Sequence, residues 1–567
     1  MVYDVILRNG TVVDGTGGSA RQADVAVLGD RIAAVTDLDE GGIADRARRE
    51  IDVEGRLVTP GFIDVHTQLD AQILWDPSGA PATDHGITSA VMGNCGLSLA
   101  PLGSAESGAV AEMLEAFSDV PREVYVEGLS WEWKSYGEYL SFLSRQSVGP
   151  NVGGMVGHAA IRMAVMGERA FDDMASTDDV AAMVDLVDEA MTAGALGFST
   201  SRTYLHRMRD GRPLPGSHAH TDELCALADV LGRHGTGVVQ GAMRLGERDG
   251  DDLANTRAEV GTLGEISRRS GRTVTFGVLQ SNRRPDLFRE VLAFTRRENE
   301  TGAQLRPQTP AHGVGMLFSL DTRTPFDEAP AWQELQTRTN GHRLQMLRDP
   351  AFRQRLINEA DVHGTALDLS RLYVLEAPDS RYDPHPERSL HEIALARGVS
   401  HGAAFIELCM EHDGHLVMYL PILNEELAAV AEMLDDEMVA IGVSAAGAHV
   451  CEVMDADQPT FLLAHWVRDQ RRWPVEEAVR RLTSDPADLF GLGDRGRLHV
   501  GAYADLNVID LEALTLPPPE FVRDLPTGAG RFVQPAGGYD YTFVNGRVFR
   551  EFDEPTGEMA GRVLRPS

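Results

Sequence analysis

Eight short apolar segments, most of them followed by a helical pattern, constrain the fold of this chain more than any other feature. Amphipathic helical patterns such as 178–194 and 222–235 follow the third and fourth segments. Strand segments that alternate with helical ones predict βα units and a parallel sheet, and eight such units in a row are typical of a (β/α)₈ barrel. We therefore expect an α/β fold with a barrel over residues 59–487. Its strands are predicted at 61–66, 88–94, 151–158, 195–200, 235–240, 273–280, 302–308 and 439–445.

Short strands with Asn-Gly, Gly-Asp and Pro-Gly turns occupy residues 1–58, and a matching set returns over residues 488–567. Strands at both ends of a helix-rich chain predict one small β-sandwich domain built from the two termini. The spacing of the barrel strands also exposes two insertions, at about 100–150 and 310–437. Segments of that length usually form lids or substrate walls above a barrel mouth.

Composition narrows the class of partner. The net charge of −34 and the pI near 4.9 disfavour binding to a nucleic-acid backbone. No apolar run approaches the ~18 residues of a membrane span, and the first residues lack a signal-peptide pattern. The four cysteines show no Cys-x-x-Cys spacing, which suits a reducing compartment. We expect a cytoplasmic protein that acts on a small-molecule substrate, and its oligomeric state stays open.

Several motifs resemble those of a known family. The stretches VILRNGTVVDGTG, GRLVTPGFIDVHT, HGITSAVMGNCGLSLAP, GALGFSTSR, GAHV, DRGRLHVGAYADLNVID and VNGRV occur in family order along nearly the whole chain. They resemble the amidohydrolase superfamily and, more narrowly, its N-acyl-D-amino-acid deacylase (D-aminoacylase) branch. The resemblance implies a (β/α)₈ barrel flanked by a β-sandwich and zinc-dependent hydrolysis of the amide of N-acyl-D-amino acids.

The same resemblance implies a site built from a His-x-His pair after strand 1, a cysteine after strand 2, histidines after strands 5 and 6, and an aspartate after strand 8. His66 matches the first histidine and Cys95 the cysteine, so these two are the candidate metal ligands. Gln68 stands where the second histidine is expected, and Ala445 stands where the aspartate is expected. The strand 5 and strand 6 regions, VVQGAMR and TFGVLQSN, contain no histidine.

These replacements predict a degenerate metal site. Zinc requires about three protein ligands of nitrogen, sulfur or oxygen type, and the neutral amide of Gln68 is a poor substitute for imidazole. The only lysine, Lys134, falls in the first insertion, which disfavours a carboxylated lysine bridging two metals. Alanine at position 445 cannot carry a proton to a leaving group. One zinc ion on His66 and Cys95 is one alternative, and the absence of any cofactor is the other.

Polar residues near the predicted strand ends supply the remaining candidates. Histidines titrate near neutral pH, and glutamines donate and accept hydrogen bonds without charge. Arg162, Arg202 and Arg244 near the mouth favour a carboxylate-bearing substrate, whereas we expect His85, His206, His218, His220 and His312 on the surface or in packing. The catalytic candidates are His66, His158 and His449, and the substrate-binding candidates are Gln68, Arg162, Gln240, Gln280, Gln308 and Ser444.

Three functions are compatible with this pattern. The resemblance favours an enzyme that hydrolyses a C–N bond in a small polar amide or related metabolite. The coordinated loss of metal-site residues favours a metal-independent acid–base enzyme of lyase, cyclase or isomerase type on the same scaffold. A polar pocket without a base could also belong to a non-catalytic binding protein or to a variant inactivated at Ala445. The sequence leaves the substrate and its stereochemistry open.

Overall fold

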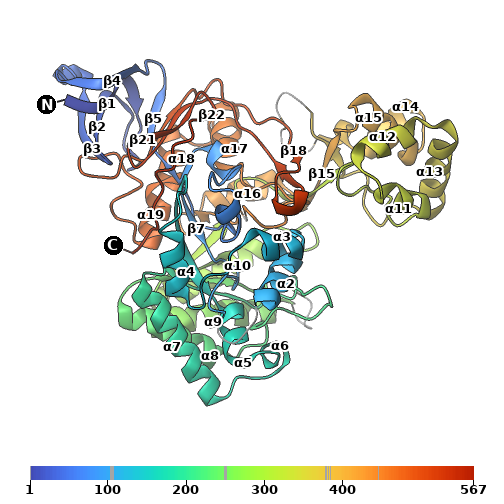
Figure 1. The fold of residues 1–567 in the computed structure, drawn as a ribbon, viewed down its shortest axis with the longest axis horizontal. Helices are drawn as coiled ribbons and strands as arrows, with labels where there is room; N and C mark the ends of the chain where they lie inside the picture. The colour runs from blue at the N-terminus through green and yellow to red at the C-terminus, as the bar shows by residue number, and fades with distance from the viewer. Residues whose placement is uncertain are drawn as a thin grey trace.

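The computed structural model describes residues 2–102, 107–247, 252–376, 380, 382, 385–444 and 446–566. Three parts can be distinguished in Figure 1: a central barrel, a β-domain that contains the first strands of the chain, and a helical unit that projects from the opposite side. Position 445, where alanine was predicted to replace a catalytic aspartate, lies outside the described residues.

The central sheet confirms the predicted barrel architecture. Eight parallel strands lie side by side in chain order and curl around a common axis, and each predicted segment overlaps one of them. The strands are β6 (Phe62–Asp64), β7 (Ile87–Met92), β8 (Asn151–Gly157), β9 (Gly197–Ser201), β10 (Val238–Ala242), β11 (Val274–Gly277), β12 (Leu305–Thr309) and β16 (Ala440–Ile441).

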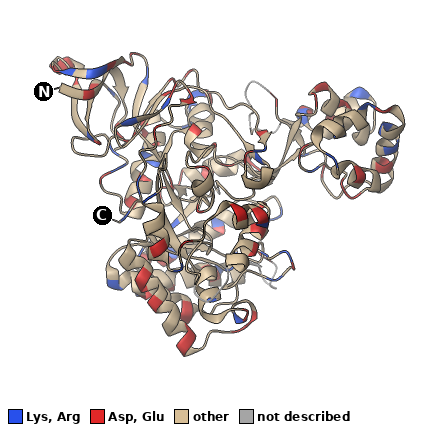
Figure 2. Ribbon diagram, viewed as in Figure 1, with Lys and Arg blue, Asp and Glu red and all other residues tan. Residues whose placement is uncertain are grey.

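Helices α5 (His158–Met166), α7 (Thr177–Ala193), α8 (Thr221–His234), α9 (Asp252–Ser270) and α10 (Leu287–Glu300) alternate with these strands. The local sequence sets their ends. Helix α7 begins with a capping box in which the Ser176 side chain accepts from Asp179 N and the Asp179 carboxylate accepts from Ser176 N. It ends at Gly194, whose φ of 103° suits glycine. Acidic side chains are distributed over such outer helices (Figure 2).

The first and last barrel strands are joined by side chains and turns rather than by a strand ladder. In the part of the chain that the structure describes, β16 and β6 share no ladder. Instead, the Ser444 hydroxyl donates to His66 O at 3.0 Å and also to the Asp64 carboxylate, and Gln68 N donates to Ala446 O at 2.7 Å. Because these bonds lie past the carboxyl ends of both strands, they fix the edge of the barrel mouth, where sites of such barrels lie.

The two ends of the chain share one sheet, as predicted. Strand β5 pairs in parallel with β1 and antiparallel with β17, so the N-terminal strands continue directly into the C-terminal ones. Val25, Val58, Leu506 and Phe543 are buried together in its core. The sheet contains β1 (Val2–Val12), β2 (Arg21–Leu28), β3 (Arg31–Asp37), β4 (Arg46–Asp52), β5 (Leu57–Pro60), β17 (Leu506–Ile509), β20 (Tyr539–Val544), β21 (Arg547–Glu551) and β22 (Glu554–Pro555).

The two insertions fold differently. The first contains α2 (Ser107–Ser118), α3 (Arg122–Gly128) and α4 (Tyr136–Leu143), whose apolar residues join the core of the barrel. The second packs Phe326, Trp332 and Phe405 into a core of its own and extends away from the barrel (Figure 1). It contains β13 (Val314–Ser319), α11 (Pro330–Gln336), α12 (Asn340–Arg348), α13 (Pro350–His363), β14 (Tyr373–Val374), α14 (Leu390–Arg397), α15 (His401–Glu411) and β15 (Val417–Leu423).

No single helix among the described residues is long and apolar enough to cross a membrane. The bent pair formed by α14 and α15 meets the requirement by length and composition, but Leu390, Phe405 and Ile406 of this pair lie buried in the helical unit.

Candidate active site

Three residues from distant parts of the chain meet at the barrel mouth. His66 follows β6, Cys95 lies in the turn after β7, and Gln308 lies near the end of β12. The Cys95 Sγ atom is 3.4 Å from His66 Nε2, and His66 Nδ1 is 3.0 Å from Gln308 Oε1. All three side chains are buried, with 7%, 4% and 0% exposure for Cys95, His66 and Gln308. Hydrogen-bond contacts thus link the Cys95 thiol to the His66 imidazole, and the imidazole to the amide oxygen of Gln308.

The turn that carries Cys95 requires its glycines. Gly93 has a φ of 74°, and a Cβ atom there would lie 2.1 Å from the Met155 carbonyl oxygen. Cys95 itself takes a left-handed backbone conformation with a φ of 57°, which is uncommon for a residue other than glycine. The Gly-Asn-Cys-Gly sequence thus presents the thiol on a tight turn toward His66.

Two glutamines, Gln240 and Gln308, also lie at this site, and a third, Gln68, follows His66 by two residues. Gln240 Oε1 accepts a 2.7 Å hydrogen bond from Cys95 N, in the same way that Gln308 Oε1 pairs with His66. The Nε2 atoms of all three glutamines are buried without a hydrogen-bond partner. An unpaired buried donor costs about 1–3 kcal/mol, so the two donors of Gln240 and Gln308 at one site indicate a place where a ligand oxygen accepts.

Burial keeps the thiol and the imidazole neutral. Burial lowers the pKa of His66 to about 4. The hydrogen bond with Gln308 favours the protonated ring and opposes this shift only in part. Burial likewise raises the pKa of the Cys95 thiol to about 12, and the hydrogen bond with Gln240 opposes that shift only in part. At neutral pH the resting pair is therefore an uncharged imidazole beside an uncharged thiol.

The residues present do not fit a tightly held zinc ion. Within the described ranges, no three histidine, cysteine, aspartate or glutamate side chains are arranged to hold a metal. His66 and Cys95 are adjacent, but the side-chain oxygens of Gln240 and Gln308 belong to neutral amides and already accept hydrogen bonds from the site itself. Zinc requires about three protein ligands, so His66 and Cys95 alone do not complete a zinc site.

Two predicted site residues, His158 and Arg162, belong to a buried hydrogen-bond network with Glu223. His158 Nε2 lies 2.8 Å from Glu223 Oε1, and its Nδ1 lies 2.9 Å from Thr200 Oγ1. Arg162 donates to Glu223 at 2.5 Å and, through its other nitrogens, to the Ala170 and Asp173 carbonyl oxygens. The structure therefore does not support His158 as a catalytic residue or Arg162 as a substrate ligand, because Glu223 on α8 engages both in a buried network.

We expect Glu223→Ala to destabilise the protein strongly. Burial raises the pKa of Glu223, but hydrogen bonds from His158 and Arg162 outweigh it and lower that pKa to about 2, so the carboxylate is ionised. Its removal would leave the buried charge of Arg162 without a counter-ion, which costs about 3–5 kcal/mol. Chemical denaturation measures the loss. The exposed pair Arg169–Asp179 is the control, since Arg169→Ala should lower the free energy of unfolding by about 1 kcal/mol or less. Equal losses for the two variants would contradict a buried ionic network around Glu223.

Of the remaining predicted residues, Gln280, Ser444 and His449 have partners other than the side chains of Cys95 and His66. Gln280 is occupied at the rim, where its Nε2 donates to Asn282 at 2.8 Å and its Oε1 accepts from Glu426 N at 3.2 Å. Ser444 serves in closing the barrel edge. His449 is partly exposed, with its Nδ1 3.3 Å from Asp119 Oδ2 and its ring 5.1 Å from that of Phe117. Of the predicted site residues that the structure describes, His66, Cys95, Gln240 and Gln308 are joined to one another by hydrogen bonds at the mouth and form the polar site.

His206 lies near this site although we expected it on the surface or in packing. Its ring contacts the Phe117 ring at 4.7 Å, and its Nδ1 is 2.9 Å from Ser201 Oγ. Burial, with smaller contributions from the nearby His449 and His66, lowers the pKa of His206 to about 3. Its position shortly after β9, at the same end of the barrel, is the signal that could have indicated it.

His312 is a packing residue that carries charge. It is fully buried, its Nε2 lies 2.9 Å from Asp457 Oδ1, and its ring stacks on that of Tyr382 at 4.7 Å. Burial alone would lower the pKa of His312, but Asp457 raises it to about 9. Nearby Asp455 has its pKa raised by burial to about 8.

The pH dependence of stability follows from these shifts. The contribution of His312 is complete below its unfolded pKa near 6.5 and is lost as the pH rises through about 9. Asp455 acts in the same direction, because its raised pKa favours the protonated folded state at low pH. We expect the free energy of unfolding to fall by several kcal/mol between pH 6.5 and 9, roughly 2–3 kcal/mol of it from His312. Urea titrations of the wild type and His312→Gln test this, and equal slopes against pH would contradict it.

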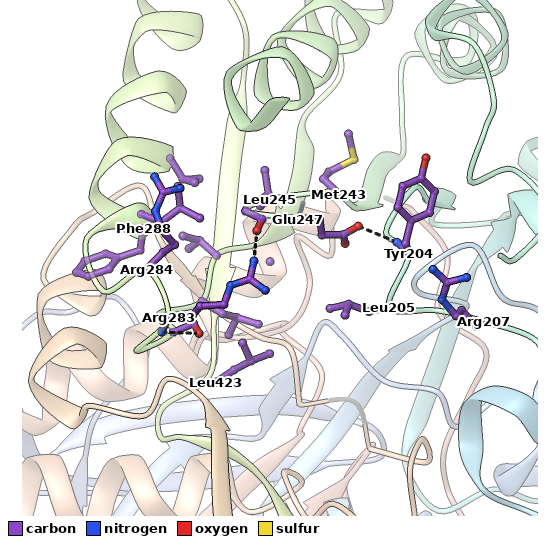
Figure 3. A pocket seen from close by; sticks show the side chains of 17 residues that line it. Tyr204, Leu205, Arg207, Met243, Leu245, Glu247, Arg283, Arg284, Phe288 and Leu423 are labelled. Carbon is purple, nitrogen blue, oxygen red and sulfur yellow. Dashed lines mark hydrogen bonds between the residues drawn. The ribbon is translucent and has the colours of Figure 1, made fainter. Parts of the chain in front are cut away.

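A cavity of about 620 Å³ opens over the ends of β10 and β11. Figure 3 shows Arg283, Arg284 and Phe288 on one side and Tyr204, Leu205 and Arg207 on the other, with Glu247 between them. Arg283 donates to Gly246 O at 2.7 Å. Three arginines face one carboxylate among its described lining residues, so the cavity favours an anionic group.

The arginines that the sequence suggested for this role are neutralised elsewhere. Arg202 and Arg244 both bind Glu259, at 3.0 and 2.9 Å. The arginines that line the cavity are instead Arg207, Arg283 and Arg284, which lie in loops after β9 and β11. The loop position of these residues, without a recognisable spacing, gave no signal in the sequence.

Comparison with known proteins shows to which family this chain belongs. A sequence profile described as the amidohydrolase family matches residues 49–550. This chain belongs to that family. A D-aminoacylase of Alcaligenes xylosoxydans xylosoxydans is 29% identical over 99% of this chain and 97% of its own length. An N-acyl-D-glutamate deacylase of the same organism is 30% identical, covering 99% and 96%.

Solved structures agree with this assignment to the amidohydrolase family. A D-aminoacylase with a binuclear metal centre superposes with a TM-score of 0.66 and 28% identity, covering 99% of this chain and 100% of that one. An N-acyl-D-glutamate deacylase from Bordetella bronchiseptica, complexed with zinc and a phosphonate inhibitor, gives 0.67 and 25%, with full coverage of both chains. The chain is thus a D-aminoacylase-like amidohydrolase, an enzyme that hydrolyses C–N bonds. This favours the hydrolase over the lyase-type and non-catalytic alternatives.

Proposed function

We propose that this amidohydrolase cleaves the amide bond of a small, carboxylate-bearing N-acyl amino acid or a closely related polar amide, and that its metal site is degenerate. The observation that carries the proposal is the cavity at the barrel mouth, with Arg207, Arg283 and Arg284 among its lining residues. Guanidinium groups bind carboxylates through paired, charge-assisted hydrogen bonds.

The cavity also has an apolar part that suits an acyl chain or an amino-acid side chain. Leu245, Phe288 and Val291 line it beside the arginines. None of the polar-site residues is among its described lining residues. The two are connected through β10, which carries Gln240, the residue that binds the Cys95 turn, while Met243 just beyond the strand lines the cavity. A substrate anchored by its carboxylate in the cavity would therefore be held at the same strand ends as His66 and Cys95.

Hydrolysis assays on purified protein test this proposal. The substrate panel pairs N-acetyl-D- and N-acetyl-L-amino acids with the matching N-acetyl-amino-acid amides, which lack the carboxylate. The protein is first dialysed against a chelator, and its metal content is determined by elemental analysis of the same sample. We expect release of the free amino acid from carboxylate-bearing members in the chelated protein. Absence of hydrolysis across the panel, both in chelator and with added zinc, cobalt or manganese, would reject the proposal.

A further inference from the structure

We infer that Cys95, His66 and Gln308 form a catalytic triad that breaks the amide bond through a covalent acyl–thiol intermediate without a metal ion. This inference rests on the amide hydrolysis proposed above and gives that reaction a nucleophile. It starts from the disagreement between the residues present and a zinc site.

The order of the three groups matches that of a nucleophile, a base and an orienting residue. Because an amide oxygen only accepts hydrogen bonds, the 3.0 Å contact with Gln308 Oε1 places the proton of the neutral imidazole on His66 Nδ1. The lone pair of Nε2 then faces the Cys95 thiol at 3.4 Å. Nucleophilic catalysis uses this arrangement, in which a base within hydrogen-bond reach of the nucleophile is held by a third group.

The other cysteines lack such a partner. Cys225 and Cys409 are fully buried within α8 and α15. Cys451 contacts only carbonyl oxygens, those of Asp119 and Gly530 at 3.7 and 3.3 Å. Among the four cysteines, all of which the structure describes, Cys95 alone has an imidazole nitrogen within hydrogen-bond reach.

Unpaired donors are available for the charge that develops on a substrate carbonyl. Gln240 is 1% exposed, its Oε1 is fixed on Cys95 N, and its Nε2 has no partner. The Nε2 atoms of Gln308 and Gln68 are also unpaired. Neutral donors held in place beside the nucleophile stabilise a developing oxyanion without first giving up other bonds.

The reaction balances with water as the only co-reactant. His66 Nε2 takes the thiol proton as Cys95 Sγ forms a bond to the carbonyl carbon, whose π electrons move to its oxygen. The C–N bond then breaks, and His66 gives its proton to the departing nitrogen, which leaves as the free amine. Water attacks the resulting thioester as His66 takes a proton from it. The C–S bond then breaks, and His66 returns that proton to the sulfur, which releases the carboxylic acid and restores the thiol and the neutral imidazole.

Trapping the acyl group tests the triad. Chelator-treated protein is mixed with the 4-nitrophenyl ester of acetic acid, quenched in acid and digested, and the acetylated peptide is located by mass spectrometry. We expect the acetyl group on Cys95, its loss in Cys95→Ala, and acylation slowed by roughly 10²-fold or more in His66→Ala. Cys409→Ala is the matched control and should label like the wild type.

Gln308 acts as a positioning residue, and two substitutions separate that role from packing. Gln308→Glu keeps an oxygen acceptor for His66 Nδ1, whereas Gln308→Leu fills the buried space but removes the acceptor. We expect Leu to slow acylation by about tenfold or more and Glu to restore much of the rate. A residue needed only for packing would give the reverse order, which would overturn the assignment.

The outcomes distinguish this triad from the proposed function. Acetyl groups on another cysteine, on none, or only after zinc is added would overturn the triad. Undiminished hydrolysis of an N-acyl amino acid by Cys95→Ala would also overturn it while leaving the proposed function intact. Acylation at Cys95 in a protein that hydrolyses no member of the substrate panel would support the triad and reject the proposed substrate class.

Discussion

His66→Ala should lower kcat for amide hydrolysis by about 10²–10⁴-fold, the range that a positioned general acid–base group contributes. Among the described residues, His66 alone is hydrogen-bonded to both the Cys95 thiol and Gln308, so its removal takes away the base and disconnects the orienting residue. Steady-state kinetics on the best substrate of the panel, in chelator, measure the effect. Circular dichroism and the thermal midpoint show whether the variant is folded.

His234→Ala provides the matched histidine control. His234 lies at the end of α8, where its Nε2 contacts Asp188 at 3.0 Å, outside the site. This variant should keep the wild-type kcat. A folded His66→Ala protein with more than about half the wild-type kcat would show that the imidazole takes no part in proton transfer.

The double substitution Arg283→Ala with Arg284→Ala should raise KM for a carboxylate-bearing substrate by about 10–100-fold and change kcat little. Each charge-assisted hydrogen bond contributes about 1.5–3 kcal/mol, and 1.4 kcal/mol corresponds to a factor of ten in affinity. Both residues line the cavity and lie on the same side of it (Figure 3). Initial rates over a range of substrate concentrations separate KM from kcat.

Two comparisons make this result specific. The matching amide substrate, which lacks the carboxylate, should show a similar KM with both proteins. Arg268→Ala on α9, whose side chain pairs with Glu298 at 2.6 Å outside the cavity, should behave as wild type. An equal rise in KM for both substrates would mean that the arginines shape the cavity without binding the carboxylate.

The sequence predicted the barrel because its signal is local. Each strand segment combines apolar alternation with flanking glycines or polar residues, and each lies where a strand is found. Gln240 and Gln308 could be placed for the same reason, since a residue at the end of a parallel strand reaches the barrel mouth whatever its neighbours are.

The parts that could not be predicted depend on partners far away in the chain. His158 and Arg162 are engaged by Glu223, which lies on a later helix, and nothing near them in sequence indicates that pairing. The same holds for the closure of the barrel edge by Ser444 and for the arginines of the cavity. The Cys95–His66–Gln308 alignment joins three strands, so it emerges only from the folded arrangement.

The central claim, that this amidohydrolase breaks its amide bond with a thiol and an imidazole rather than with a bound cation, is tested most directly by one combined measurement. Turnover of an N-acyl amino acid is followed in the same protein sample whose metal content is determined after chelation. Our account predicts full turnover with far less than one metal ion per chain. Activity that disappears with the metal and returns in proportion to stoichiometric zinc would contradict it.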